Sequence, residues 1–125
     1  GWEELSFLAD QDLVTIGAHT VTHPILTHLS DDDLIRELGA CRSDIEARLG
    51  VRPRHFAYPH GGPREARRRE FDAVEAAGYE SAVTTRTDVV RAAMSTRLNE
   101  LPRITVNGLF QHMRRTCLDI GCHWG

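Results

Sequence analysis

Residues 16–24 read Ile-Gly-Ala-His-Thr-Val-Thr-His-Pro, and this stretch decides the fold. The β-branched and apolar run at its start predicts a buried strand over Val14–Ala18. Pro24 disfavours a helical conformation at His23, so the two histidines do not lie on successive turns of one helix. We expect His19 at the carboxyl end of the strand and His23 on the following loop. A tight loop would bring both imidazoles onto one metal ion, where ligands of parallel α/β folds gather.

A pair of histidines four residues apart also occurs by chance in a chain with seven histidines, so the spacing alone leaves a structural role open. Three local features favour metal ligation: the strand before the pair, the threonines Thr20 and Thr22 within it, and the proline after it. The hydroxyls of these threonines can bond nearby backbone groups and hold the loop in one shape.

The composition is that of one globular domain, so we expect residues 1–125 to form a single domain. The chain is 41% hydrophobic and 26% charged, which is ordinary for a protein with one packed core. No apolar run reaches membrane-spanning length. A net charge of -3 argues against a general nucleic-acid binder. The spacing of Cys41, Cys117 and Cys122 matches no zinc-ribbon pattern.

Hydrophobic spacing and capping residues predict an alternation of strands and helices. A helix is expected over Trp2–Ala9, and a longer one begins at Ser30 or Asp31 and ends at Gly50, with Cys41 buried on its apolar stripe. The further expected elements are a strand over His55–Tyr58, a helix over Arg64–Ala77, strands over Ser81–Thr84 and Leu101–Val106, and a helix after Asn107. This order predicts an α/β fold with a mostly parallel sheet and right-handed crossovers.

Two further groups of side chains leave alternatives open. Four arginines, Arg64, Arg67, Arg68 and Arg69, are expected on the solvated face of their helix, with a contact to an anionic polymer as the alternative. At the end of the chain, Cys117, Cys122 and His123 are expected in a frayed segment, with a metal site as the alternative.

Five stretches, taken in order, resemble the polysaccharide deacetylases that carry a NodB-homology domain: Trp2–Leu5, Gly17–Pro24, Phe56–Gly61, Ala77–Ala82 and Leu101–Ile104. The resemblance runs over most of the chain, and the histidine and Tyr-Pro stretches are its specific parts. It implies a partial, irregular (β/α) barrel that forms the later portion of such a domain. It also implies the removal of N-acetyl groups from chitin-like sugars, peptidoglycan and related polymers, in the cell envelope or outside the cell.

The resemblance also implies roles for particular residues. His19 and His23 would be the imidazole ligands of a divalent metal, with zinc expected first. Tyr58 and His60 would be catalytic residues of the turn that lines the groove, and the backbone N–H of His60 would donate to the oxyanion of the tetrahedral intermediate. The metal would polarise the acetamide carbonyl and activate water. Thr20 would shape the loop.

The sequence departs from the family pattern at several places. Relatives carry an earlier Thr-Phe-Asp-Asp stretch, whose aspartates supply the catalytic base and a metal ligand, and this stretch does not occur here. His60 stands where a tyrosine is usual, and Ala57 where many relatives have arginine. The nearest candidate for the general acid is His112, and Asp88 is a candidate replacement carboxylate.

We therefore expect a metal-dependent deacetylase domain that acts on N-acetylated polysaccharides or oligosaccharides. The alternatives are a truncated, inactive module that binds glycan or metal, and a regulatory or assembly fragment. An unpaired edge at Val14–Ala18 would invite pairing with another chain, so we expect a homo-oligomer.

Overall fold

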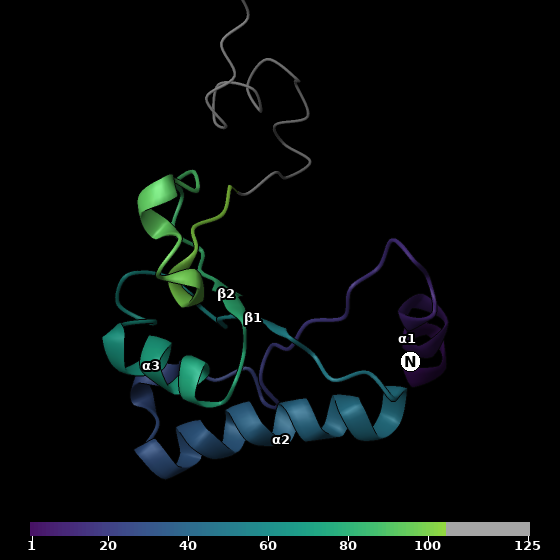
Figure 1. Ribbon diagram of the computed structural model, residues 1–125. Helices are drawn as coiled ribbons and strands as arrows, with labels where there is room; N and C mark the ends of the chain where they lie inside the picture. Colours follow the sequence, from purple (N-terminus) through teal and green to yellow (C-terminus); the bar gives the residue numbers. More distant parts are fainter. Residues whose placement is uncertain (105–125) are drawn as a thin grey trace, which may run out of the picture.

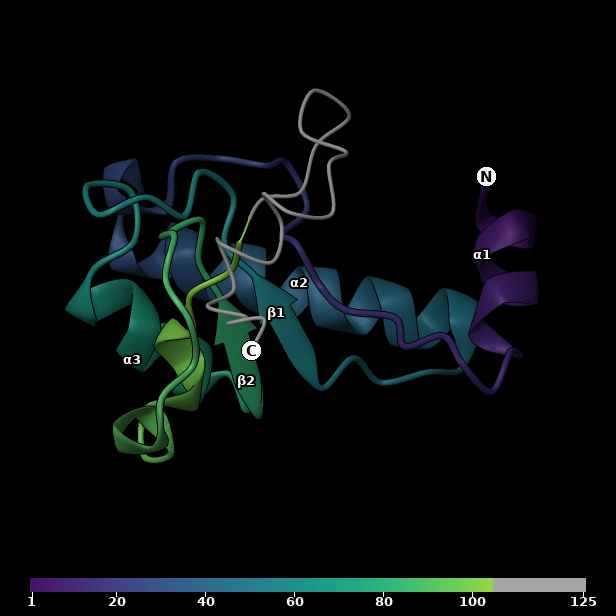
Figure 2. The same cartoon turned by 90° about the horizontal axis from the view of Figure 1, so that it is seen from above.

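The computed structural model describes residues 1–104 (Figure 1). Its helices are α1 (Trp2–Ala9), α2 (Asp31–Leu49) and α3 (Arg68–Ala76), its strands are β1 (His55–Ala57) and β2 (Ser81–Val83), and its short 3-10 helices are η1 (Leu26–His28), η2 (Ala92–Met94) and η3 (Leu98–Glu100). The long helix α2 runs below the strands, with α3 beside its amino-terminal part and α1 over its carboxyl-terminal end. Figure 2 shows the same arrangement from above.

The two strands form a small parallel sheet, which confirms the predicted α/β class. Phe56 of β1 lies opposite Ala82 of β2, and single parallel bridges extend the pairing on both sides. Ala18 bridges to Phe56, and Leu101 bridges to Val83. Across the sheet the paired segments therefore follow one another as Ala18, β1, β2 and Leu101, which is also their order in the chain. Residues 1–104 do not close this sheet into a barrel.

The two outer strands predicted from the sequence are shorter than expected, and those predictions were wrong. In the segment Val14–Ala18 only Ala18 pairs, because β1 offers only three residues as a partner. In the segment Leu101–Val106 only Leu101 pairs among the described residues. Pro102 has no N–H to donate, and the Arg103 N–H bonds the Arg86 carbonyl instead of β2. Residues 105 and 106 lie outside the described part.

Helix α2 confirms its prediction, because its signals are local. The Ser30 hydroxyl accepts the Asp33 N–H at the start, and Gly50 adopts a left-handed φ of 67° at the end. The predicted apolar stripe enters the core at Leu34, Leu38 and Cys41. The core also contains side chains of β1, β2 and α3, with Leu26, Tyr58 and Tyr79 among its largest members.

Helix α3 begins at Arg68, so the start predicted at Arg64 was wrong. Residues 62–66 instead form a turn that is closed by the Gly62 carbonyl. The Glu70 carboxylate then accepts the Arg67 N–H at 2.8 Å and caps the helix. Although Glu70 is only 1% exposed, its charge is compensated by the guanidinium of Arg69 at 2.8 Å.

Arg69 makes bonds that the sequence did not predict. Its guanidinium does reach the surface, but it donates to the carbonyl oxygens of Leu26 and Leu29 at 2.9 and 3.1 Å. It also pairs with Asp31 at 3.1 Å. Arg69 therefore fastens α3 to η1 and to the start of α2. All four arginines of the predicted group are exposed, as expected, but Arg64 and Arg67 lie before α3 rather than on it.

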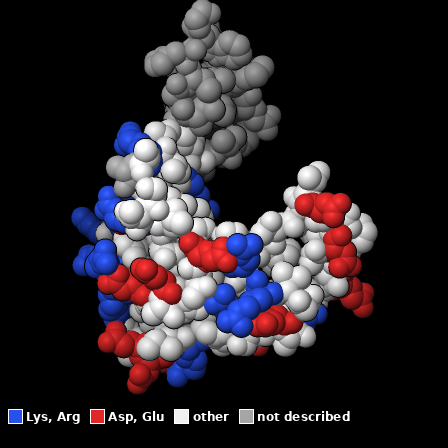
Figure 3. Space-filling view, viewed as in Figure 1, with Lys and Arg blue, Asp and Glu red and all other residues white. Residues whose placement is uncertain are grey.

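Helix α1 has the predicted bounds, but none of its side chains is buried. It contacts α2 through Trp2, whose ring lies under the Arg48 guanidinium at 4.7 Å. Figure 3 shows a hollow between α1 and the rest of this face. None of the helices among residues 1–104 has the length and apolarity that a membrane crossing requires.

The residues His112, Cys117, Cys122 and His123, and the helix predicted after Asn107, lie outside the described residues.

Candidate functional site

Three histidine rings lie in a row at the carboxyl ends of the paired segments. The ring centres of His19 and His23 are 4.8 Å apart, and those of His23 and His60 are 4.9 Å apart. Two imidazoles that bind one tetrahedral metal ion have ring centres roughly 5 Å apart. The loop therefore brings the His19 and His23 rings together as the sequence predicted, and it adds His60 as a neighbour.

The orientation of His19 is fixed by β1. Ala18 pairs with β1 through both backbone groups: its N–H donates to the His55 carbonyl, and its carbonyl accepts the Ala57 N–H. The next residue, His19, then places Nδ1 at 2.8 Å from the Ala57 carbonyl oxygen. A carbonyl is an acceptor only, so Nδ1 donates and Nε2 keeps its lone pair. This is the orientation in which a histidine binds a metal through Nε2.

The loop between the two histidines has an uncommon backbone. Thr20 and His23 both adopt left-handed φ values, 65° and 57°, which cost energy for residues other than glycine. The Thr20 hydroxyl donates to the His19 carbonyl at 2.5 Å and accepts the His23 N–H at 3.1 Å. As predicted, Thr20 holds the loop in shape, because its hydroxyl bridges the two histidines.

Helix α2 supports the same loop from outside. The Glu37 carboxylate accepts the Val21 and Thr22 N–H groups at 2.8 and 3.1 Å, and the Thr22 hydroxyl at 2.7 Å. Burial opposes the ionisation of Glu37, but these bonds and the nearby Arg36 charge outweigh it and lower the pKa of Glu37. The sequence analysis missed this residue.

One turn further along α2, Cys41 lies behind the loop. Burial raises the pKa of the Cys41 thiol, and this effect outweighs the opposite effect of the nearby His19 and Thr20 backbone. Cys41 is therefore a buried, protonated thiol, which confirms the prediction from its place on the apolar stripe.

The turn after β1 carries His60 at its tip, with a left-handed φ of 50°. Tyr58 begins the turn, and its ring is 1% exposed in the core. The Tyr58 hydroxyl donates to the Asn99 carbonyl at 2.7 Å. Burial, with nearby Glu70 and Glu100, raises the pKa of Tyr58, so its hydroxyl stays protonated. The Tyr58 side chain thus anchors the turn, and a role in the chemistry stays a prediction.

Within residues 1–104, no three histidine, cysteine, aspartate or glutamate side chains converge so that they could hold a metal ion. The His23 and His60 rings lie at 72° to each other, much as the His19 and His23 rings do at 71°, and the three side chains do not form a group that could hold a metal ion. Asp88, the candidate replacement carboxylate, accepts the Val89 N–H and pairs with Arg91. The described residues therefore bring the His19 and His23 imidazoles close together, and metal binding by this pair stays a prediction.

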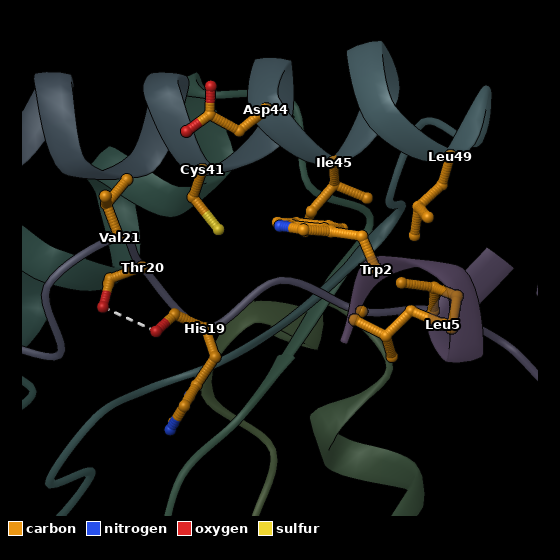
Figure 4. A pocket seen from close by; sticks show the side chains of 11 residues that line it. Trp2, Leu5, His19, Thr20, Val21, Cys41, Asp44, Ile45 and Leu49 are labelled. Carbon is orange, nitrogen blue, oxygen red and sulfur yellow. Dashed lines mark hydrogen bonds between the residues drawn. The ribbon is translucent and has the colours of Figure 1, made fainter.

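An apolar groove of about 290 Å³ lies between α1, α2 and the segment before His19 (Figure 4). Trp2, Ile45 and Leu49 line it, and the Cys41 sulfur points into it. The His19 imidazole points away from the groove. The groove and the row of histidines therefore lie on opposite sides of the same segment.

Comparison with known proteins decides the family. A family described as polysaccharide deacetylase matches residues 1–82. The chain belongs to the polysaccharide deacetylase family. Chitin deacetylase 1 of Cryptococcus neoformans var. grubii is 41% identical over 46 residues, which cover 37% of this chain and 10% of that protein.

Solved deacetylases have a similar fold. The Streptococcus pyogenes deacetylase PplD, in complex with acetate, superposes with a TM-score of 0.64 and 27% identity over 72% of this chain and 38% of its own. A de-N-acetylase from Aggregatibacter actinomycetemcomitans superposes with a TM-score of 0.77 and 14% identity, over 95% of this chain and 52% of its own. The second similarity concerns the fold alone. This polysaccharide deacetylase chain thus spans between a tenth and about half of the length of these relatives.

Proposed function

We propose that this chain is the later portion of a metal-dependent polysaccharide deacetylase domain, which hydrolyses N-acetyl groups of amino-sugar polymers. The observation that carries the proposal is the pair His19 and His23, with ring centres 4.8 Å apart and the His19 ring oriented by the Ala57 carbonyl. In the complete domain, further strands would close the parallel sheet into an irregular (β/α) barrel.

His19, through Nε2, and His23 would hold a divalent metal, with zinc as the first choice because imidazole suits it. When bound, such an ion polarises the acetamide carbonyl and activates water near neutral pH. The protein's own contribution is to fix the two imidazoles: the Ala57 carbonyl fixes the His19 tautomer, and the Thr20 hydroxyl fixes the backbone between the ligands.

The turn at Tyr58–Gly61 would stabilise the developing oxyanion. His60 is exposed at the tip, next to His23, so a substrate held at the two imidazoles lies beside this turn. A backbone N–H at such a position can donate to the oxygen that becomes negative. The buried Tyr58 ring and its bond to the Asn99 carbonyl keep the turn in place.

The alternative function is an inactive module that binds glycan or metal. It is favoured by one observation: residues 1–104 contain no group of three histidine, cysteine, aspartate or glutamate side chains that could hold a metal ion. Aspartates from a Thr-Phe-Asp-Asp stretch elsewhere in the longer protein would complete the site for catalysis.

Two measurements test the proposal. Calorimetric titration with zinc should show binding that is lost in His19→Ala and His23→Ala and kept in His28→Ala, whose ring is exposed on η1. Acetate release from N-acetylated chitooligosaccharides should occur with the complete protein and require both histidines. Zinc binding without acetate release would support the inactive module, and zinc binding that survives both substitutions would refute the site.

A further inference from the structure

We propose that Glu37 is the positioning residue for the two histidines, and that it sets the metal affinity without touching the metal. The inference rests on the proposed function, because it assigns a task within that site. Its physical basis is a set of hydrogen bonds that tie the loop between the histidines to one face of α2.

Two neighbouring backbone amides and one hydroxyl of the loop donate to Glu37 of α2. The N–H groups of residues 21 and 22 donate to Glu37, and the buried Cys41 thiol lies one helical turn further along, behind the same loop. Glu37 and Cys41 are four residues apart, so they lie on the same face of the helix. The next amide, of His23, donates to the Thr20 hydroxyl. The three consecutive amides from Val21 to His23 are therefore each held by a side chain.

Glu37 supplies the strongest part of this support. Both of its carboxylate oxygens are used: Oε2 accepts two neighbouring N–H groups at 2.8 and 3.1 Å, and Oε1 accepts the Thr22 hydroxyl at 2.7 Å. Hydrogen bonds to an ionised acceptor are about twice as strong as neutral ones.

The loop needs this support because its backbone is strained. Thr20 and His23 are held in left-handed conformations on either side of the amides that Glu37 accepts. Such conformations persist only where the surroundings impose them. Without Glu37, the loop can relax by rotating these residues, and the His23 ring would then leave its place 4.8 Å from His19.

Substitutions at Glu37 and at a matched glutamate separate this role from a general effect on the helix. Glu46 lies on the same helix and makes one long ion pair, 3.7 Å to Arg52, with both side chains exposed. We would compare Glu37→Ala, Glu37→Gln and Glu46→Ala in the full chain. Glutamine keeps one acceptor oxygen, so Glu37→Gln gives a folded, intermediate variant if alanine prevents folding.

Three readouts are needed: zinc affinity by competition with a chelator, amide hydrogen exchange at Val21 and Thr22, and the unfolding free energy. Loss of a residue that orients metal ligands typically lowers metal affinity about 10–100-fold. We expect that loss in Glu37→Ala, a smaller loss in Glu37→Gln, and a change of less than about 2-fold in Glu46→Ala. Exchange at Val21 and Thr22 should be faster only in the Glu37 variants.

Unchanged zinc affinity in folded Glu37→Ala would overturn the inference, as would unchanged exchange at the two amides. A loss of stability without faster exchange at these amides would give Glu37 a structural role only, which also overturns it. If the wild type binds no zinc, the proposed function fails. The exchange readout, with the NMR signals of the two histidine rings, then decides the role of Glu37 by itself.

Discussion

The Nδ1 atom of His19 lies 2.8 Å from the carbonyl oxygen of Ala57. This side-chain hydrogen bond joins the histidine loop to β1, in addition to the backbone hydrogen bonds of Ala18. We predict that neutral His19 is the tautomer with the proton on Nδ1. Long-range ¹H–¹⁵N spectra above neutral pH should show this pattern for His19, with exposed His28 as the comparison. A proton on Nε2 of His19 would contradict the orientation assigned to this ligand.

Gly61 lies where the turn after β1 approaches the end of β2. A Cβ atom there would meet the Thr85 nitrogen at 2.9 Å and Thr84 and Tyr58 atoms at 3.1 Å. We predict that Gly61→Ala lowers the unfolding free energy by about 1–3 kcal/mol. The matched control is Gly39→Ala in α2, where nothing lies within 4 Å, and it should stabilise by about 0.5–1 kcal/mol. Urea unfolding measures the free energy of both variants. Similar changes in unfolding free energy for Gly61→Ala and Gly39→Ala would refute the close approach of the turn to β2.

Arg69 and Arg68 are neighbours with different surroundings. Removing Arg69 takes the guanidinium from buried Glu70 and two donors from the carbonyls of η1. We predict that Arg69→Ala costs about 1–3 kcal/mol of unfolding free energy. Arg68→Ala removes only an exposed pair with Asp72 and should cost less than about 0.5 kcal/mol. Equal losses in urea unfolding would contradict the tether between α3 and η1.

The lowered pKa of Glu37 predicts a pH dependence with a definite sign. Because its pKa is lower in the folded state, its stabilising contribution is complete above its ordinary value of 4.5 and is lost as the pH falls below that value. The stability difference between the wild type and Glu37→Gln should therefore be largest near neutral pH and shrink in acid. Urea unfolding over this range checks it, and a difference that grows in acid would refute it.

The sequence predicted the elements whose signals are local. Helix α2 has its cap at Ser30, its apolar stripe and its terminal Gly50 within one segment, and its bounds were right. The closeness of the His19 and His23 rings was also expected, because Thr20 acts within the same loop, and their joint binding of a metal stays a prediction.

The errors concern residues whose neighbours are distant in the chain. The length of the strand before His19 depends on β1, which begins 36 residues after His19 and pairs with only one residue of that segment, Ala18. The bonds of Arg69 to η1 cross about 40 residues and leave no pattern in the sequence. One feature of the sequence could have drawn attention to Glu37: it lies beside the apolar stripe of α2, between Leu34 and Cys41. Nothing in the sequence indicated that the histidine loop would lie against it.

The order of pairing in the sheet bears on how the protein is made. Ala18 pairs with Phe56 of β1, β1 pairs with β2, and β2 pairs with Leu101, so each segment joins the one synthesised just before it. Domains form from the amino terminus as the chain leaves the ribosome. Each new segment of this chain therefore finds its partner already exposed, and the loop that carries His19 and His23 can dock on α2 before β2 has been translated.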